Sequence, residues 1–276
     1  MKIPITTNDS FGKFSVISIT KGDFIGLSKT IDSMLMQKYI DWEMIIVVGS
    51  DSDSSFKYAR EKSQTDQRFI VTHQNTDGIY PAMNQGISLV TGNYLWFMNS
   101  GDCFHNENSL KEVAKIMGEN EYSMLLGGYE LFDVDGKNYS FKNLYVSARR
   151  FSLNIRSGCH QSTIYRVDRP DNIPMFRTDL KIASDFDWIL RQIIDKSCYR
   201  IKQTLAIIEP GGISDTGIRQ VISEKQKIRE DVFGRYSIDA FLGHLWSIGV
   251  LTKIYSRRFL VYLRTIFTIN FWASGL

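Results

Sequence analysis

The sequence predicts an α/β protein with a doubly wound, mainly parallel sheet and a C-terminal helical appendage. The first observation is that short apolar runs recur along the first half of the chain, each followed by a polar or helix-periodic stretch. The second is that these runs are continuous rather than alternating, which is typical of strands covered on both faces. The predicted strands are Phe14–Ile19, Met44–Val48, Phe69–Thr72, Tyr94–Met98 and Met124–Leu126.

Apolar residues at helical spacing lie between these strands and again in the second half. Residues 131–141 predict a hairpin that turns at Asp135 and Gly136, and Thr204–Ile208 predicts a strand that ends before Pro210. Because strands and helices alternate through about residue 127, ligands are expected beyond the carboxyl ends of the strands. The predicted helix faces are Leu27, Ile31, Met34 and Leu35; Ile79, Met83 and Val90; Leu110, Val113, Ala114 and Met117; and Phe186, Ile189, Leu190, Ile193 and Ile194.

The composition is that of a folded globular protein, with 276 residues, 43% of them hydrophobic and 23% charged. The 33 basic and 30 acidic residues give a net charge of +3, so we expect no nucleic-acid partner. Cys103, Cys159 and Cys198 have no CxxC spacing, which favours reduced thiols and a cytoplasmic protein. The first twenty residues lack the apolar run of a signal peptide, so export is not expected.

The last part of the chain, residues 236–276, predicts an amphipathic helical tail. Between Ala240 and Leu276 there is no Asp or Glu, while aromatic residues alternate with Lys253, Arg257, Arg258 and Arg264. This pattern indicates a helix that lies in a membrane interface rather than one that crosses the bilayer. Each basic residue beside an anionic leaflet contributes about 1 kcal/mol. The alternatives are a helical hairpin buried against the main domain and an oligomer contact.

The densest polar segment runs from Asp77 to Asp102 and contains the candidate site. It reads DGIYPAMNQG and then TGNYLWFMNSGD, so that a short helix is followed by an apolar strand with Asp102 at its carboxyl end. Gly101 beside this carboxylate allows a close approach of the backbone. Oxygen ligands of this kind suit Mg²⁺ or Mn²⁺, which commonly bridges to substrate phosphates. The alternative is that Asp102 only ends the strand in a turn.

This segment resembles the donor-site signature of family-2 glycosyltransferases of the GT-A fold, close to the branch that builds bacterial capsule, O-antigen and exopolysaccharide. The resemblance extends over about residues 14–215 and implies one GT-A domain at 1–235. Its nucleotide-sugar-binding half would be 14–127 and its acceptor-side half 128–235, before the tail at 236–276. The supporting segments are Val16–Thr20, Glu43–Asp53, CHQS at 159–162, ASDFD at 183–187 and GGIS at 211–214.

The resemblance implies that a sugar moves from a nucleoside diphosphate, a UDP-sugar, to a hydroxyl of a lipid-linked glycan, with inversion and with Mn²⁺ or Mg²⁺. Asp185 matches the general base, Asp187 is the runner-up base, and His160 would line the acceptor or diphosphate pocket. Asp102 matches the metal ligand. The implied donor-binding residues are Thr20, Asp51, Asp53, Asp77, Asn84, Asn99 and Asp102.

Three positions depart from the family pattern. The base-recognising Asp of the family is either replaced by Val48 or displaced to Asp51. Pro81 replaces an Asp of the branch pattern, and Asn99 stands where other members carry a first carboxylate. These losses leave the nucleobase and the sugar open. They also leave open a second function, a non-catalytic subunit of a membrane assembly that binds nucleotide sugar or glycan. A nucleotidyltransferase and a dehydrogenase are disfavoured because no glycine-rich phosphate loop follows the first predicted strand.

Several candidate residues also have a structural interpretation. Asp185 or Ser184 would serve equally as the N-cap of the helix that begins there. His105 comes three residues after Asp102, within reach of a metal, but a surface loop is the simpler interpretation. Arg149 and Arg150 would clamp a diphosphate, although adjacent arginines usually form a solvated face.

Overall fold

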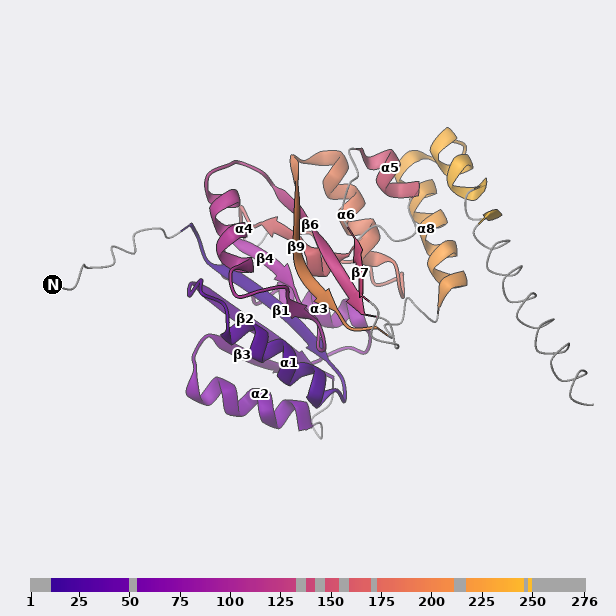
Figure 1. Cartoon of the computed structure of the whole chain (residues 1–276). Coiled ribbons are helices and arrows are strands. Elements are labelled where there is room, and N and C mark those ends of the chain that lie inside the picture. Colours follow the sequence, from indigo (N-terminus) through magenta and orange to yellow (C-terminus); the bar gives the residue numbers. More distant parts are fainter. Residues whose placement is uncertain are drawn as a thin grey trace, which may run out of the picture.

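The structure is a computed structural model that describes residues 11–49, 54–132, 138–141, 147–153, 159–169, 173–210, 217–245 and 248–249. In these ranges a mixed sheet lies between helices on its two faces (Figure 1). The strands are β1 (Phe14–Thr20), β2 (Trp42–Val48), β3 (Phe69–His73), β4 (Tyr94–Phe97), β5 (Cys103–Phe104), β6 (Met124–Phe132), β7 (Asn138–Phe141), β8 (Thr163–Arg166) and β9 (Cys198–Ile208). The helices are α1 (Phe24–Leu35), α2 (Ser54–Thr65), α3 (Ile79–Ile87), α4 (Ser109–Gly118), α5 (Ala148–Leu153), the 3₁₀ turn η1 (His160–Ser162), α6 (Ser184–Asp195) and α8 (Ile218–Phe233).

The order of strands across the sheet is β3-β2-β1-β4-β8-β6-β9-β5, with β7 paired to β6. The first four strands are parallel, as the sequence predicts. The second half is mixed, because β8 runs antiparallel to both β4 and β6 while β6 and β9 are parallel. This reversal brings η1, which precedes β8, to the carboxyl end of β4.

Both faces of the parallel strands are buried, which explains their continuous apolar sequence. In β1, Val16 belongs to one apolar core and its neighbour Ile17 to the other, and neither is exposed. Residues of α1 and α4 pack in the first core, and residues of α3, α6 and α8 in the second. Because successive strand residues point to opposite faces, two separate cores favour apolar residues on both faces, although Ser15 and Ser18 of β1 are also fully buried.

The structure confirms the predicted strands and most residues of the predicted helix faces, but Val90 lies beyond the end of α3 at Ile87. Leu35 and Ile194 were expected on buried faces, but they lie in the last turns of α1 and α6 and are 42% and 45% exposed. The strand predicted at Thr204–Ile208 begins earlier, at Cys198. The expected hairpin exists as the antiparallel pair of β6 and β7, while its turn, residues 133–137, lies outside the described residues.

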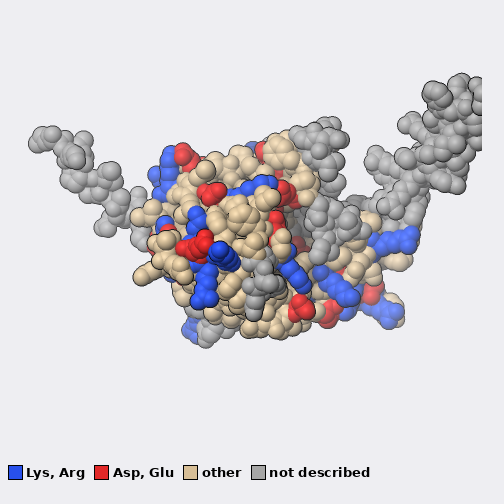
Figure 2. Space-filling view, turned by 90° about the horizontal axis from the view of Figure 1, so that it is seen from below, with Lys and Arg blue, Asp and Glu red and all other residues tan. Residues whose placement is uncertain are grey.

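The described part of the C-terminal segment is a helix at residues 238–245. Ala240 is buried, and Gly243 lies so close to α8 that an added Cβ would be 2.4 Å from Cδ of Arg229. None of the helices among the described residues is long and apolar enough to cross a membrane. On the face of the molecule shown in Figure 2, basic and acidic side chains are intermixed, as the near-balanced composition suggests. Residues 250–276, which include the four basic residues of the tail, lie outside the described residues.

Candidate active site

The loop that follows β4 carries Asn99 and Asp102 at the carboxyl edge of the parallel strands. Its backbone continues the pairing with β1, since the amide of Ser100 donates to the carbonyl of Ile19 at 3.2 Å. Gly101 has a φ of +95°, which disfavours other residues. The hydroxyl of Thr30 in α1 accepts from the amide of Gly101 at 3.0 Å and lies 2.8 Å from the carbonyl oxygen of Asp102. The loop is therefore fixed to both β1 and α1.

The Asp102 carboxylate is 5% exposed and accepts two hydrogen bonds. The side-chain amide of Gln161 donates to Oδ2 at 2.7 Å, and the backbone amide of Glu209 donates to Oδ1 at 3.1 Å. Burial raises the pKa of Asp102 to about 6, although these two bonds and the nearby His160 oppose the shift. The carboxylate is therefore held in a fixed orientation at a cost in desolvation.

Asn99, His160, Asp185 and Tyr80 form a continuous chain of polar contacts. Nδ2 of Asn99 lies 3.0 Å from Nε2 of His160, and Nδ1 of His160 lies 3.3 Å from Oδ2 of Asp185. Since the amide nitrogen of Asn99 can only donate, this pattern assigns the imidazole proton to Nδ1, which donates to Asp185. The hydroxyl of Tyr80 donates to Oδ1 of Asp185 at 3.3 Å. The side chain of Asp185 remains 21% exposed, so an oriented carboxylate meets solvent here.

Asp187, the runner-up base, has a different environment from Asp185. It is 3% exposed, both of its oxygens lie 3.0 Å from Nε of Arg191, and Nη1 of Arg177 is 3.7 Å from Oδ1. The Asp187 carboxylate therefore forms ion pairs with both arginines. Of the two aspartates, Asp185 is the more exposed, and its role as the general base stays a prediction.

A side chain of another helix holds the backbone that leads into α6. The N-cap residue is Ala183, so the interpretation of Asp185 or Ser184 as the N-cap is wrong. Instead, the carboxylate of Glu224 in α8 accepts from the backbone amides of residues 181, 182 and 183 at 3.0, 2.9 and 2.9 Å. A carboxylate at this position also interacts favourably with the helix dipole.

The remaining residues predicted to bind a donor are placed differently. Thr20 is 6% exposed at the end of β1, whereas the side chain of Asp77 is 94% exposed with Oδ1 3.5 Å from Nζ of Lys21. The amide of Asn84 bonds in both directions to the backbone of Phe176, at 2.9 and 2.8 Å. Asn84 thus fastens the segment before α6, and its contact with a donor stays a prediction. Asp51, Asp53 and the GGIS element at 211–214 lie outside the described residues.

Two other candidates have partners away from this chain of contacts. Nε2 of His105 lies 3.7 Å from Oε1 of Glu130. Nε of Arg149 forms an ion pair with Asp239 of the C-terminal helix. Arg149 therefore joins α5 to that helix.

The loop after β4 offers oxygen ligands for a divalent cation. In the described part of the chain, Oδ1 of Asn99 is buried and has no hydrogen-bond partner. Asp102 supplies a carboxylate three residues later. Among the described residues, no three His, Cys, Asp or Glu side chains are grouped so as to hold a metal ion by themselves. Magnesium is commonly held by one or two protein oxygens together with substrate phosphates. Asn99 and Asp102 fit that mode of binding.

Sequence analysis missed four residues around Asp185 and Asp102. Tyr80 and Gln161 lie inside the quoted motifs, but the motifs alone do not reveal which carboxylate each one contacts. Glu224 and Lys225 lie in α8, where Lys225 shares a buried face with residues at helical spacing. A lysine at an otherwise core-facing position was the signal that could have found it.

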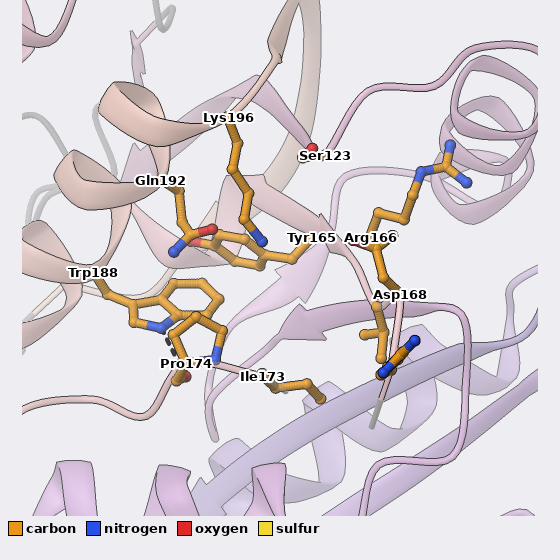
Figure 3. Close-up of a pocket in the computed structure, with 11 residues that line it drawn as sticks. Ser123, Tyr165, Arg166, Asp168, Ile173, Pro174, Trp188, Gln192 and Lys196 are labelled. Carbon is orange, nitrogen blue, oxygen red and sulfur yellow. Dashed lines mark hydrogen bonds between the residues drawn. The ribbon is translucent and has the colours of Figure 1, made fainter. Parts of the chain in front are cut away.

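A pocket is also present at the opposite edge of the sheet (Figure 3). Because β8 is antiparallel to β4, the end of β8 lies beside the amino ends of the parallel strands. The pocket therefore lies on the side away from the loop after β4, although its lining includes Tyr165, whose pKa is raised by burial and further by the charge of Asp185. Its lining includes Tyr165, Ile173, Pro174, Trp188, Gln192 and Lys196.

Comparison with known proteins gives a family and a fold. Residues 15–196 match the family described as "Glycosyl transferase family 2". A "PGL/p-HBAD biosynthesis glycosyltransferase" of Mycobacterium bovis (strain BCG / Pasteur 1173P2) is 28% identical over 210 residues, which is 74% of this chain and 79% of that protein.

Two solved structures resemble the chain in fold. S. aureus TarS 1-349 in complex with UDP-GlcNAc has a TM-score of 0.63 at 18% identity. The match covers 83% of this chain and 69% of the TarS chain. The mannosyltransferase PcManGT from Pyrobaculum calidifontis, in complex with GDP-Man and Mn²⁺, has a TM-score of 0.57 at 11% identity. The match covers 93% of this chain and 83% of the PcManGT chain.

Proposed function

The chain belongs to glycosyl transferase family 2 and has the GT-A fold, and from that premise we propose that it moves a sugar from a UDP-sugar to a hydroxyl of a lipid-linked glycan, with inversion at the anomeric carbon. The observation that carries the proposal is Asp185, a partly exposed carboxylate oriented by His160 and Tyr80. It is linked through His160 to the loop that holds Asp102. The complex of TarS with UDP-GlcNAc supports a UDP-sugar as the donor.

Asp185 would act as the general base in a single displacement. As the acceptor hydroxyl oxygen bonds to the anomeric carbon, its proton passes to Asp185, and the bond from that carbon to the diphosphate oxygen breaks. General base catalysis of this kind contributes roughly 10²- to 10⁴-fold. Positioning both substrates would supply much of the remaining rate enhancement. His160 and Tyr80 would act by orienting the carboxylate.

Asp102 and Asn99 would hold a divalent cation, Mn²⁺ or Mg²⁺, beside the donor. When bound, such a cation supplies positive charge that stabilises the leaving diphosphate. The Mn²⁺ in the complex of PcManGT supports this part of the proposal. Thr20 and Asp77, with Asp51 and Asp53, which precede α2 in the sequence, are proposed to contact the nucleotide.

The C-terminal segment 236–276 is proposed to attach domain 1–235 to the inner face of the cytoplasmic membrane. One side of the helix at 238–245 faces α8, and apolar side chains on its other side are 36% to 69% exposed. Their spacing is that of a single helix face, and the acid-free, basic sequence that follows suits an anionic leaflet. A membrane location supports a lipid-linked acceptor and a role in surface polysaccharide synthesis. These residues of the helix are Ile238, Phe241, Leu242 and Leu245. Ile248, beyond the helix at 238–245, is 49% exposed.

The test is the release of nucleoside diphosphate from a panel of nucleotide sugars, with Mn²⁺, Mg²⁺ or chelator, in the presence of extracted lipid acceptors. We expect cation-dependent release with one UDP-sugar, and its loss in Asp102→Ala. Activity that survives both chelation and this substitution would exclude the metal role. Tight donor binding in calorimetry, with no transfer to any acceptor, would instead favour the non-catalytic binding subunit.

A further inference from the structure

The 3₁₀ turn η1 places two consecutive side chains against the two candidate cation ligands of the loop after β4. Nε2 of His160 lies 3.0 Å from Nδ2 of Asn99, and Nε2 of Gln161 donates to Oδ2 of Asp102 at 2.7 Å. The partners are 61 and 59 residues apart in sequence, and the antiparallel pairing of β8 with β4 brings them together. The orientation of both candidate ligands therefore depends on one short turn.

The backbone around Gln161 is fixed by bonds that do not involve the candidate site. The indole Nε1 of Trp96 in β4, which is fully buried, donates to the carbonyl of Gln161 at 2.8 Å. The hydroxyl of Thr163 donates to the carbonyl of Cys159 at 2.8 Å, across the turn. The side chain of Gln161 thus extends from a rigid backbone toward the Asp102 carboxylate.

The side-chain amide of Gln161 has one possible orientation in this setting. Its Oε1 lies 3.4 Å from Sγ of Cys159, while its Nε2 faces Asp102. Burial raises the pKa of the Cys159 thiol to about 12, so the sulfur keeps its proton and donates to Oε1. An ionised carboxylate only accepts hydrogen bonds, so the amide nitrogen of Gln161, and not its oxygen, must face Asp102. Both ends of the amide are therefore fixed.

The bonds to Asp102 leave part of its carboxylate available to a cation. An ionised carboxylate has about four acceptor positions on its two oxygens. Gln161 takes one position on Oδ2, and the backbone amide of Glu209 takes one on Oδ1. Carboxylates that bind metal ions are themselves hydrogen-bonded by neighbouring groups, which orient them. In the described part of the chain, Gln161 is the one side chain that donates to this carboxylate.

We propose that Gln161 is a positioning residue for the divalent cation, whose side-chain amide orients the Asp102 carboxylate for cation binding. The inference rests on the proposed function, because it takes Asp102 as a ligand of the cation. Gln161 lies in the predicted acceptor-side half of the chain, 128–235, yet its amide acts on the donor side. Without this amide the carboxylate loses one of the two bonds that fix it, so its ordering would oppose cation binding.

The test compares Gln161→Met and Gln161→Asn with Gln192→Met as the matched control. Methionine is unbranched like glutamine but has no N–H donor, and asparagine keeps the amide on a side chain one carbon shorter. Gln192 of α6 is as buried as Gln161, 8% against 9% exposed, and it lines the pocket at the other edge of the sheet. The readout is the binding of Mn²⁺ in the presence of UDP, followed by the electron paramagnetic resonance signal of free Mn²⁺.

In both Gln161 variants we expect the dissociation constant of Mn²⁺ to rise about 10- to 100-fold, while the affinity for UDP without a cation is unchanged. The Mn²⁺ concentration that gives half-maximal transfer should rise by the same factor. At saturating Mn²⁺, kcat should return to within about twofold of its original value, because Gln161 contacts no reacting group. Gln192→Met should match the unsubstituted chain in all of these quantities.

Two results would overturn the proposal. One is a dissociation constant of Mn²⁺ in Gln161→Asn that equals that of the control. The other is an equal loss of UDP and Mn²⁺ affinity together with a lower thermal midpoint, which would mark a merely structural residue. If Gln161→Met does not fold, as thermal unfolding will reveal, Gln161→Asn decides, because it keeps a polar group in the buried position.

Failure of the proposed function gives a different result. If the unsubstituted chain binds Mn²⁺ with UDP but transfers no sugar, the transfer reaction is refuted and the Mn²⁺ dissociation constants still decide the role of Gln161. If the unsubstituted chain binds UDP but no Mn²⁺, the cation role of Asp102 is refuted, and the role of Gln161 with it.

Discussion

Replacing Glu224 by alanine is expected to lower the free energy of unfolding by about 2 kcal/mol, because three backbone amides that lead into α6 would lose their charged acceptor. The carboxylate accepts three backbone amides, from residues 181, 182 and 183. A single side-chain cap contributes 0.5–2 kcal/mol, and hydrogen bonds to a charged acceptor are stronger than neutral ones. Because Glu224 is partly accessible, water replaces some of the lost bonds, so the value stays near the upper end of the range for one cap.

The measurement is the thermal midpoint and a urea titration of Glu224→Ala beside Glu230→Ala. For a domain of this size, 2 kcal/mol corresponds to a fall of about 4–8 °C. Glu230 lies on the same helix, and its side chain accepts from Gln226 at 3.0 Å, so the control should change by no more than about 0.5 kcal/mol.

The pH dependence gives a second check on the same substitution. Burial raises the pKa of Glu224, but the amides of residues 181–183 and the side chain of Gln220 together lower it below its ordinary value. A lowered carboxylate pKa contributes stability above the unfolded value of about 4.3, and this stability is lost as the pH falls through the folded value. The two proteins should therefore converge in stability below about pH 4. A midpoint in Glu224→Ala within 1 °C of the unsubstituted chain at pH 7 would refute the capping argument.

Three further predictions concern the site and the tail. Asp185→Asn should lower kcat by roughly 10²- to 10⁴-fold and leave the donor affinity nearly intact. Asp187→Asn should mainly lower the thermal midpoint, because it breaks the contacts to Arg191. Equal losses of kcat and donor affinity in Asp185→Asn would contradict its role as a base. Because the pKa of Asp102 is raised to about 6, protonation of Asp102 below that pH should progressively weaken cation-dependent donor binding. Calorimetry between pH 5 and 8 measures this change in donor affinity. A constant affinity over this range would count against Asp102 as a metal ligand. Phe241→Asp should move the protein from anionic vesicles to the supernatant in a sedimentation assay without lowering donor hydrolysis, and an unchanged vesicle fraction would exclude this helix face as the contact.

The parallel half of the fold could be predicted because its sequence carries a local signal. Residues such as Val16 and Ile17 enter two different cores, so neighbouring positions of the strand are both apolar and the strand does not alternate strictly between apolar and polar residues. The second half gives no such signal. Strand β8 has four residues and β5 has two, too few for periodicity. Helix α8 places Lys225 and Arg229 on its buried face, where a search for apolar residues does not find a stripe.

The candidate site was predictable in its chemistry and less so in its contacts. The motifs identified Asp102 and Asp185 as carboxylates of interest. They did not reveal that Gln161 donates to the first or that Tyr80 donates to the second, because these pairs are 59 and 105 residues apart in sequence. Asn84 illustrates the converse, since its motif position suggests a ligand contact while its amide bonds to Phe176, 92 residues away.

The Thr30 hydroxyl joins α1 to the loop that carries Asp102. A valine in place of Thr30 would match its shape but could form no hydrogen bond. The buried amide of Gly101 and the carbonyl of Asp102 would then lose their partner. Such a change would leave every candidate reactive side chain in place. The position of Asp102, however, would depend on a loop backbone that no longer bonds to α1. A search for essential positions restricted to ionisable side chains would pass over this one.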